Sequence, residues 1–296
     1  MFIVIGGSGY LGSYLIKNII DNTDSDIIAT HSTTSENRNN YNGRVKWVKL
    51  DIASSIDVDY FCTAYLTKNI HYDIIYLAAY HHPDKVEENR NIAWNINVSS
   101  LDYFLDKAKT KIKSLYYAST DSVYGESIEN QVFSEDDYCN PINTYGRTKF
   151  IAEQIVIMHG FSVLRYSLLM GPSLIAKQHF FDTIVNSLKN NNSIDMFSDS
   201  YRSVISFELA AELTIKLLLS HYKPKDILNI SGDIAISKYD IAFGIAQNLN
   251  LDHKYLNKVS ILTNNNFASK RAQNTLISNK KIKNVLKIPK IEYDFK

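Results

Sequence analysis

The glycine-rich segment near the start of the chain constrains the fold more than any other feature. Gly6-Gly7-Ser8-Gly9-Tyr10-Leu11-Gly12 follows the apolar run Phe2 to Ile5. Its glycines fit both G-x-G-x-x-G and G-x-x-G-x-x-G, which allow a tight turn and close approach of the backbone to phosphate. Leu11, Leu15 and Ile19 then recur at helical spacing, so the next segment buries one face on a sheet. This order predicts a dinucleotide site whose helix amides face a pyrophosphate.

Short apolar runs along the first part of the chain predict a parallel sheet. Stretches with helical patterning separate them, which is the rhythm of βαβ units. The runs lack apolar and polar alternation, as expected of strands covered on both faces. We therefore expect an α/β fold, a Rossmann-type doubly wound parallel sheet with a smaller C-terminal α/β substrate lobe. The runs are Phe2 to Ile5, Ile27 to Ala29, Val45 to Leu50, Ile74 to Ala79, Leu115 to Ser119 and Val163 to Tyr166.

The pattern changes beyond about Gly171, where mixed helical stretches surround one short strand-like run, Ile194 to Phe197. Ser237-Lys238-Tyr239-Asp240 predicts a capping box that opens a helix through Leu249. A last short helix is expected over residues 278–286. We expect a dinucleotide-binding domain at residues 1–170 and a smaller substrate-binding lobe at residues 171–296, interleaved with the first.

Composition excludes several classes of protein. The chain has 296 residues, 45% of them hydrophobic, and a formal net charge of +1 without long blocks of one sign. This balance gives no electrostatic case for a nucleic-acid or membrane partner. Cys62 and Cys139 have no paired spacing and no cluster with histidines, so we expect neither a disulfide framework nor a metal site. No secretion signal or membrane-spanning run is visible, and a cytoplasmic protein is expected.

A tyrosine and a lysine four residues apart are the candidate acid and base. In Tyr145-Gly146-Arg147-Thr148-Lys149 both side chains share one face if the segment is helical. A cation beside a phenol favours the phenolate and lowers the phenol pKa from its ordinary value near 10. Tyr103 and Lys107 have the same spacing but precede the expected fifth strand. Thr120 ends that strand, at the edge where open α/β sheets bind ligands, and its hydroxyl can bond a substrate oxygen.

These motifs, in this order, resemble the extended short-chain dehydrogenase/reductases over nearly the whole chain. Within that superfamily they are most similar to the dTDP-4-dehydrorhamnose reductase family of sugar-nucleotide reductases. The segments that carry the similarity are Leu77-Ala78-Ala79-Tyr80 with Asp84-Lys85-Val86-Glu87, Ser119-Thr120-Asp121, Tyr145 to Lys149 leading into Glu153-Gln154, and Asn274-Thr275-Leu276-Ile277-Ser278.

The resemblance implies a role for each matching residue. Thr120, Tyr145 and Lys149 would form the catalytic set, Asp51 would approach the adenine, and Asn97 would support the site. Asp121 and Tyr124 would touch the sugar, and Arg202 could pair with a substrate phosphate through its guanidinium. The residues assigned to the cofactor are Gly6, Ser8, Gly9, Tyr10, Leu11, Gly12, Ser32, Arg38, Asp51, Ile52, Ala78, Ala79, Tyr80, Asn97, Tyr145 and Lys149.

Cofactor choice depends on the end of the second strand. An acidic residue there would bond the ribose 2′-hydroxyl of NAD, but this chain has Thr30-His31-Ser32-Thr33. Hydroxyls and the nearby Arg38 suit a 2′-phosphate better, which favours NADPH and leaves NADH open.

The expected function is reduction of a nucleotide-linked 4-keto-6-deoxysugar in deoxysugar or surface polysaccharide biosynthesis. Val123-Tyr124-Gly125 is more like the epimerase and dehydratase branch, so a 4-epimerase that keeps NAD bound stays open. Asp121-Ser122 lacks the second carboxylate that a 4,6-dehydratase of this fold uses. A regulatory subunit that keeps the dinucleotide fold without turnover is the third alternative. A homodimer is left open.

Overall fold

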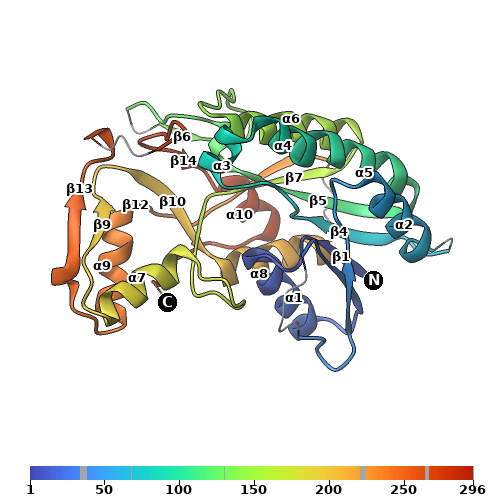
Figure 1. Cartoon of the computed structure of the whole chain (residues 1–296), viewed down its shortest axis with the longest axis horizontal. Coiled ribbons are helices and arrows are strands. Elements are labelled where there is room, and N and C mark those ends of the chain that lie inside the picture. Colours follow the sequence, from blue (N-terminus) through green and yellow to red (C-terminus); the bar gives the residue numbers. More distant parts are fainter. Residues whose placement is uncertain (34–38, 68, 130, 221–224, 264–266, 296) are drawn as a thin grey trace.

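The computed structural model describes residues 1–33, 39–67, 69–129, 131–220, 225–263 and 267–295. Within these residues the main element is a seven-stranded parallel sheet, with the strands in the order β11-β7-β5-β4-β1-β2-β3. This order and the helices on both faces confirm the doubly wound Rossmann-type sheet (Figure 1). The strands are β1 (Phe2–Ile5), β2 (Ile27–His31), β3 (Val45–Lys49), β4 (Tyr72–Tyr76), β5 (Ile112–Thr120), β7 (Ser162–Tyr166) and β11 (Ile227–Ile230).

Two hydrophobic cores cover the two faces of this sheet. Successive residues of β1 alternate between them, Phe2 and Val4 in one and Ile3 and Ile5 in the other, so all four are buried. One face packs against α1 (Tyr10–Asn22), α8 (Phe207–Leu219) and α10 (Lys280–Leu286). The other packs against α2 (Ser55–Tyr65), α5 (Ser100–Ala108) and α6 (Thr144–Met158) (Figure 1). The short helices α3 (Pro83–Glu88) and α4 (Arg90–Trp94) precede α5.

A third core lies beside the carboxyl end of the large sheet. It is built on β8 (Leu168–Met170), β10 (Tyr201–Ser206) and β12 (Ala235–Ser237), which form a three-stranded sheet. The pair β9 (Ile194–Phe197) and β13 (Leu256–Val259) and the helices α7 (Phe180–Lys189) and α9 (Lys238–Asn248) complete this lobe (Figure 1). Ser237 caps α9 by accepting from the Asp240 amide, as its capping sequence predicts.

The chain beyond Gly171 serves both parts of the molecule. Its helix α8 packs on α1, and its strand β11 pairs in parallel with β7 at the edge of the large sheet. A further parallel pair joins β6 (Val132–Phe133), from the first part of the sequence, to β14 (Leu276–Ile277). The division at residue 170 and the interleaving of two domains stay predictions; what the structure shows is that elements from beyond Gly171 pack on and pair with the large sheet.

One expected strand differs from the observed one in a way that matters for the site. The run Ile74 to Ala79 predicted a strand, but β4 spans Tyr72–Tyr76. The Leu77 amide still donates to the Ile5 carbonyl of β1 at 2.8 Å, but the backbone of Ala78 to Tyr80 continues past the carboxyl edge of the sheet and lines a cavity there.

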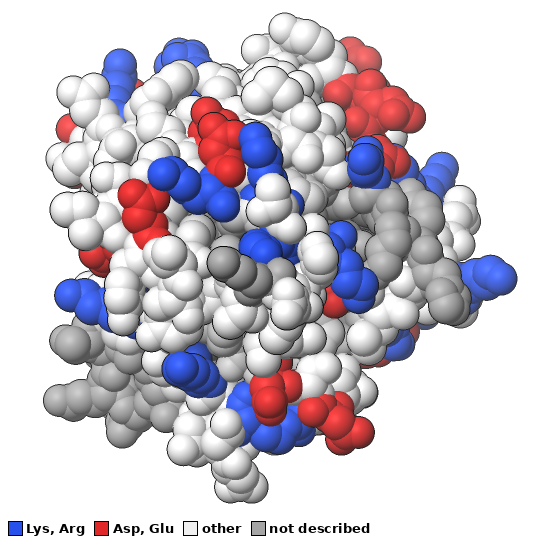
Figure 2. Space-filling model, turned by 90° about the vertical axis from the view of Figure 1, so that its right-hand side faces the viewer, with Lys and Arg blue, Asp and Glu red and all other residues white. Residues whose placement is uncertain are grey.

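Acidic and basic side chains are intermixed on the face of the molecule shown in Figure 2. Among the described helices, none combines the length and apolar character that crossing a membrane requires.

Candidate active site

A cavity of about 760 Å³ opens at the carboxyl end of the large sheet. Its walls come from the segments that follow β1, β3 and β4 and from the ends of β2 and β5, where open α/β sheets bind ligands. Most of the residues predicted from the sequence line it: Gly6, Ser8, Gly9, Tyr10, Leu11, Gly12, Ser32, Asp51, Ile52, Ala78, Ala79, Tyr80, Thr120, Asp121, Tyr145 and Lys149. Arg38 lies outside the described residues.

The glycine turn needs its glycines for two different reasons. Gly6 has φ +83°, and a Cβ there would lie 2.8 Å from the Ala78 amide nitrogen, so the fold itself requires a glycine. At Gly12 a Cβ would lie 2.6 Å from the carbonyl oxygen of Gly7, where the helix packs against the turn. At Gly9 the nearest atom would be the Gly6 oxygen at 3.4 Å, so this position is open on its cavity side.

The helix that follows the turn presents its amide end to the cavity. Gly9 is the N-cap residue of α1, and neither a capping side chain nor an acidic residue in the first turn occupies that end. The free amides and the helix dipole make it an attractive position for an anion. Thr30 supports the turn by accepting a hydrogen bond of 2.9 Å from the Gly6 amide.

The three expected catalytic residues converge on one wall of the cavity. Tyr145 and Lys149 lie one turn apart on α6, whose N-cap Asn143 accepts from the Gly146 amide at 2.8 Å. Thr120 ends β5, and its hydroxyl accepts from the Ser122 amide at 3.2 Å and donates to Asp121 Oδ1 at 3.1 Å. The shared face of the helix and the end of the strand thus meet at the same cavity.

The electrostatics of Tyr145 differ from the expectation. Burial raises the pKa of its phenol above the ordinary value, the Asp121 carboxyl raises it further, and a hydrogen bond with Thr120 lowers it. The expected lowering of the phenol pKa is not found in this structure, because burial and the Asp121 carboxyl both raise it and the Thr120 hydrogen bond opposes them only in part. A neutral phenol at neutral pH is suited to donate a proton.

Lys149 and Asp121 are both buried. Burial lowers the pKa of Lys149 to about 7, and the Glu153 carboxylate opposes that shift. The Lys149 ammonium donates to the Ala118 carbonyl at 2.5 Å. Burial raises the pKa of Asp121, while the positive charge of Arg202 lowers it. Two groups of this site therefore change charge closer to neutrality than they do in water.

Asn97 lies behind the cavity wall. Its side-chain oxygen accepts from the Tyr80 amide at 2.8 Å, and its nitrogen donates to the Tyr80 carbonyl at 3.0 Å and to Thr148 Oγ1 at 3.1 Å. These bonds tie the segment after β4 to α6. Asn97 belongs to a π-helical turn, η1 (Asn95–Ser99), a local geometry that is frequent at functional sites.

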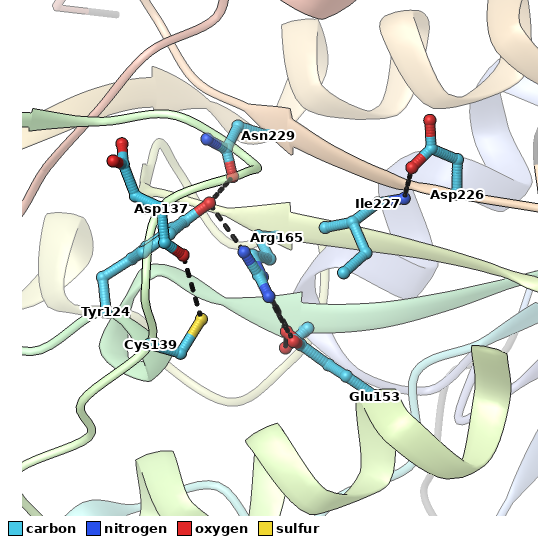
Figure 3. Close-up of polar contacts among 9 residues, drawn as sticks. Tyr124, Asp137, Cys139, Glu153, Arg165, Asp226, Ile227 and Asn229 are labelled. Atoms are coloured by element: carbon cyan, nitrogen blue, oxygen red, sulfur yellow. Dashed lines mark hydrogen bonds and ion pairs between the residues drawn. The ribbon is translucent and has the colours of Figure 1, made fainter. Parts of the chain in front are cut away.

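Tyr124 is placed away from the cavity. It is almost fully buried, its hydroxyl donates to Asn229 Oδ1 at 2.9 Å, and Arg165 Nη1 donates to that hydroxyl at 2.7 Å (Figure 3). Arg165 in turn forms a bidentate ion pair with Glu153, with Nη2 to Oε2 at 2.7 Å. The expectation that Tyr124 touches the sugar is therefore not supported, because the phenol serves a buried charge pair that requires full hydrogen bonding.

Arg202 lies on β10. It donates to the carbonyls of Gln273 at 3.1 Å and Ala272 at 2.8 Å, and its charge acts on Asp121. It is half-buried and does not line the cavity itself.

Several lining residues carry no signal in the sequence. His81, Lys177, His179 and Phe207 line the cavity, and the last three come from the chain beyond Gly171. His179 caps α7, and its ring packs against the rings of Tyr10 and Phe207, with centroid distances of 4.9 and 4.8 Å. Burial lowers its pKa to about 4. A metal is not indicated by these histidines, since no group of potential ligands gathers among the described side chains.

Comparisons with known proteins agree with this geometry. The chain is 27% identical over 213 residues to a protein of Methanocaldococcus jannaschii named "Putative UDP-glucose 4-epimerase", covering 67% of this chain and 66% of that protein. It is 28% identical over 195 residues to bovine methionine adenosyltransferase 2 subunit beta, covering 63% of this chain and 57% of that one. The chain thus spans less than two thirds of the length of these two relatives.

A reductase and a solved structure match over more of the chain. The dTDP-4-dehydrorhamnose reductase of Aggregatibacter actinomycetemcomitans is 23% identical over 250 residues, covering 82% of this chain and 77% of that protein. The crystal structure of dTDP-4-dehydrorhamnose reductase from Bacillus anthracis in complex with NADP has a TM-score of 0.81 at 20% identity, covering 99% and 95% of the two chains. That likeness confirms the fold.

The family follows from a match across almost the entire sequence. The family model described as "RmlD substrate binding domain" matches residues 1–295, which include the glycine turn, the Tyr145 and Lys149 pair and the C-terminal lobe. The resemblance drawn from the sequence motifs is thereby confirmed. The chain belongs to the RmlD substrate binding domain family.

Proposed function

We propose that this protein reduces the keto group of a nucleotide-linked 4-keto-6-deoxysugar, with NADPH as the reductant and NADH as the second option. The observation that carries the proposal is the convergence of Thr120, Tyr145 and Lys149 on the cavity that also contains the glycine turn. A phosphate site and a proton donor in one cavity suit a dinucleotide reductase. Deoxysugar or surface polysaccharide biosynthesis is the setting we propose for it.

The residues present fit a dinucleotide. Gly9 leaves open space in front of the free amide end of α1, where a pyrophosphate would bind. Ser32 and Asp51 line the part of the cavity beyond β2 and β3, where the adenosine ribose would lie. Ser32 brings no negative charge that would repel a 2′-phosphate, which favours NADPH. When bound, the dinucleotide supplies the hydride that the carbonyl carbon accepts.

The chain's own residues then complete the reduction. Thr120 donates a hydrogen bond to the carbonyl oxygen and orients it. Tyr145 gives its proton to the same oxygen as negative charge develops there, so that the ketone becomes an alcohol and the phenol becomes a phenolate. The Lys149 ammonium stabilises that phenolate, and solvent returns the proton to Tyr145 after the product leaves.

A group of cations near Asp121 supports a nucleotide-linked substrate. Lys238 opens α9, and burial together with the charges of Arg202 and Arg271 lowers its pKa to about 8. Arg271 pairs with Asp84 through Nη2 at 2.8 Å, while its Nη1 is buried without a hydrogen-bond partner among the described residues. Three cations held this close favour a dianionic group such as a diphosphate.

Aromatic rings adjoin these cations. The Lys238 ammonium lies 5.5 Å from the ring centre of Phe197, and the Arg271 guanidinium 4.9 Å from that of Phe267. The two rings are 5.8 Å apart. Such a surface can contact the base of a nucleotide, which a free sugar lacks.

The proposal is tested by following NADPH oxidation with a panel of 4-keto-6-deoxysugars linked to different nucleotides. Each turnover should oxidise one NADPH, consume one proton and yield one alcohol. The same keto sugars without a nucleotide should react far more slowly, because they lose the contacts with the cationic group. No oxidation with any nucleotide-linked keto sugar, in a protein that binds NADPH, would overturn the reductase proposal.

Two alternative functions predict different products. The Methanocaldococcus relative's name and the Val123-Tyr124-Gly125 sequence favour a 4-epimerase, which would interconvert sugar epimers with bound NAD and no net oxidation. The relative named as a methionine adenosyltransferase subunit favours a non-catalytic binding subunit, which would bind a dinucleotide without turnover. Product analysis by NMR after incubation with 4-hydroxy and 4-keto sugars separates all three.

A further inference from the structure

Tyr117 lies directly beneath the ammonium of Lys149. Its side chain points to the same face of the sheet as that of Ser119, the face that α6 covers, and packs in the core that includes Ala152. The Lys149 Nζ lies 4.0 Å from the centre of the Tyr117 ring. This contact and the Ala118 carbonyl hold the ammonium on two sides.

Other charged and titratable groups face the ammonium less directly. Glu153, one turn further along α6, acts on it electrostatically, but Glu153 already pairs with Arg165 from β7. His81, which follows β4, is close enough that the charge of Lys149 lowers its pKa. Tyr145 on α6 and the buried Tyr76 of β4 act electrostatically on Tyr117, and Asp121 acts on Tyr145.

The hydroxyl of Tyr117 takes no part in this arrangement. The ring is almost fully buried, and its hydroxyl has no hydrogen-bond partner among the described residues. The hydroxyl of Tyr76 on β4 also lacks a hydrogen-bond partner among the described residues, and its ring centre is 5.9 Å from that of Tyr117. A buried hydroxyl without a partner costs stability, so the contribution of Tyr117 comes from its ring.

We propose that Tyr117 is a positioning residue for Lys149, whose ring face holds the lysine ammonium charged and in place through a cation–π contact. An ammonium taken out of water loses its hydration, and the negative face of an aromatic ring replaces part of it. The contact is stronger where little water reaches it, and only 2% of the Lys149 surface is exposed, on the cavity wall. The effect on catalysis rests on the proposed function, whereas the effect on the charge of Lys149 does not.

The test titrates Lys149 in the cofactor-free protein. Acetic anhydride labels only the neutral amine, so the yield of labelled Lys149 against pH, measured by peptide mass spectrometry, gives the midpoint of its titration. In Tyr117→Leu we expect that midpoint to fall by about one pH unit, because the charged form loses the ring. Tyr117→Phe should keep the wild-type midpoint and raise the melting temperature, because it removes the unpartnered hydroxyl.

Matched controls separate the ring contact from general damage to the core. Tyr76→Leu removes an equally buried tyrosine from the neighbouring strand and should leave the Lys149 midpoint unchanged. If Tyr117→Leu does not fold, phenylalanines with increasing ring fluorination at position 117 weaken the negative ring face while keeping its shape. The midpoint should then fall stepwise with fluorination. Equal midpoints across the fluorinated series, or equal shifts in Tyr117→Leu and Tyr76→Leu, would overturn the proposal.

A second readout connects the contact to turnover. If Lys149 must be charged, kcat/KM decreases as pH rises through its titration, and this alkaline limb should move to lower pH in Tyr117→Leu. A shifted labelling midpoint in a protein that reduces no keto sugar would leave the Tyr117 contact standing and reject the proposed function. An unshifted labelling midpoint in a protein that reduces keto sugars would reject the Tyr117 contact and leave the proposed function standing.

Discussion

The chain contains two tyrosine and lysine pairs with identical spacing, and they lie in opposite environments. Tyr103 and Lys107 lie on α5, where the phenol donates to the exposed Asp59 at 2.9 Å and the ammonium pairs with the same carboxylate at 3.1 Å. Tyr145 and Lys149 lie on α6 at the carboxyl end of the parallel sheet, where Lys149 is buried and both line the cavity.

The difference shows that the spacing creates only the opportunity for chemistry. In both pairs a helix turn brings a phenol and an ammonium to one face. On α5 the lysine's charge is satisfied by a carboxylate and exposed to solvent, so its pKa is raised. On α6 burial lowers the pKa of the lysine to about 7 and raises that of the phenol. Burial at the carboxyl edge of the sheet therefore shifts both pKa values in a pattern that has no such effect on the exposed face of α5.

The strongest test of this contrast removes each phenol. Tyr145→Phe keeps the ring but deletes the proton, and turnover should fall on the order of 100-fold or more, as expected of a general acid. Cofactor affinity should change little. Tyr103→Phe should leave turnover near the wild-type value. Steady-state kinetics on both variants decide the matter, and similar losses in the two would mean that neither pair has a special role.

The glycine turn offers a second pair of like residues in unlike surroundings. Gly9→Val should fold with a melting temperature near that of the wild type but bind NADPH more than about tenfold more weakly, because its side chain fills the phosphate space. Gly12→Val should instead lower the melting temperature strongly, since its Cβ would overlap the Gly7 carbonyl. Fluorescence titration and thermal unfolding measure the two effects. Unimpaired binding by a folded Gly9→Val would remove the phosphate assignment.

A negative charge should change the cofactor preference when it is placed at Ser32, inside the cavity, and not when it is placed at Ser193, outside it. Ser32→Asp should shift the ratio of kcat/KM for NADPH over NADH toward NADH, on the order of tenfold, because a carboxylate repels a 2′-phosphate. Ser193→Asp, at an exposed position before β9, should leave the ratio as it is. A wild-type preference for NADH would contradict the NADPH assignment.

The smallest expected effect concerns stability. The pKa of Lys149 falls from 10.5 to about 7 on folding, so the unfolded chain binds more protons between these values and stability rises with pH there. The cost of the buried charge is therefore fully present below pH 7. Lys149→Met should raise the melting temperature by several degrees at pH 6 and by less at pH 10. Lys107→Met should change it little at either pH, and a pH-independent effect of Lys149→Met would contradict this reasoning.

Local patterns predicted the parts of the site that lie close together in sequence. The glycine turn, the strand that ends at Thr120 and the helix that carries Tyr145 and Lys149 each follow from a short signal, and βαβ topology then brings them to one edge. The same reasoning left Tyr103 out of the predicted site, because Tyr103 precedes β5.

Long-range packing decided what the sequence could not show. Tyr124 directly follows the site strand, yet its phenol completes a buried network with Arg165 and Asn229, partners that lie 41 and 105 residues away. His179 and Lys177 reach the cavity from the second lobe without any local motif. The pKa of Tyr145 is raised mainly by burial, and the four-residue spacing between Tyr145 and Lys149 carries no information about how buried the phenol is.

The placement of α8 and β11 has a consequence for how the molecule can be cut and how it folds. A fragment ending at residue 170 would contain every motif of the predicted dinucleotide site but would leave the edge of β7 unpaired and would expose the apolar surface that α8 covers beside α1. Exposed strand edges and apolar faces favour aggregation. The part of the chain before residue 170 can therefore reach its native state only after α8 and β11 have packed onto it, so its assembly depends on long-range contacts.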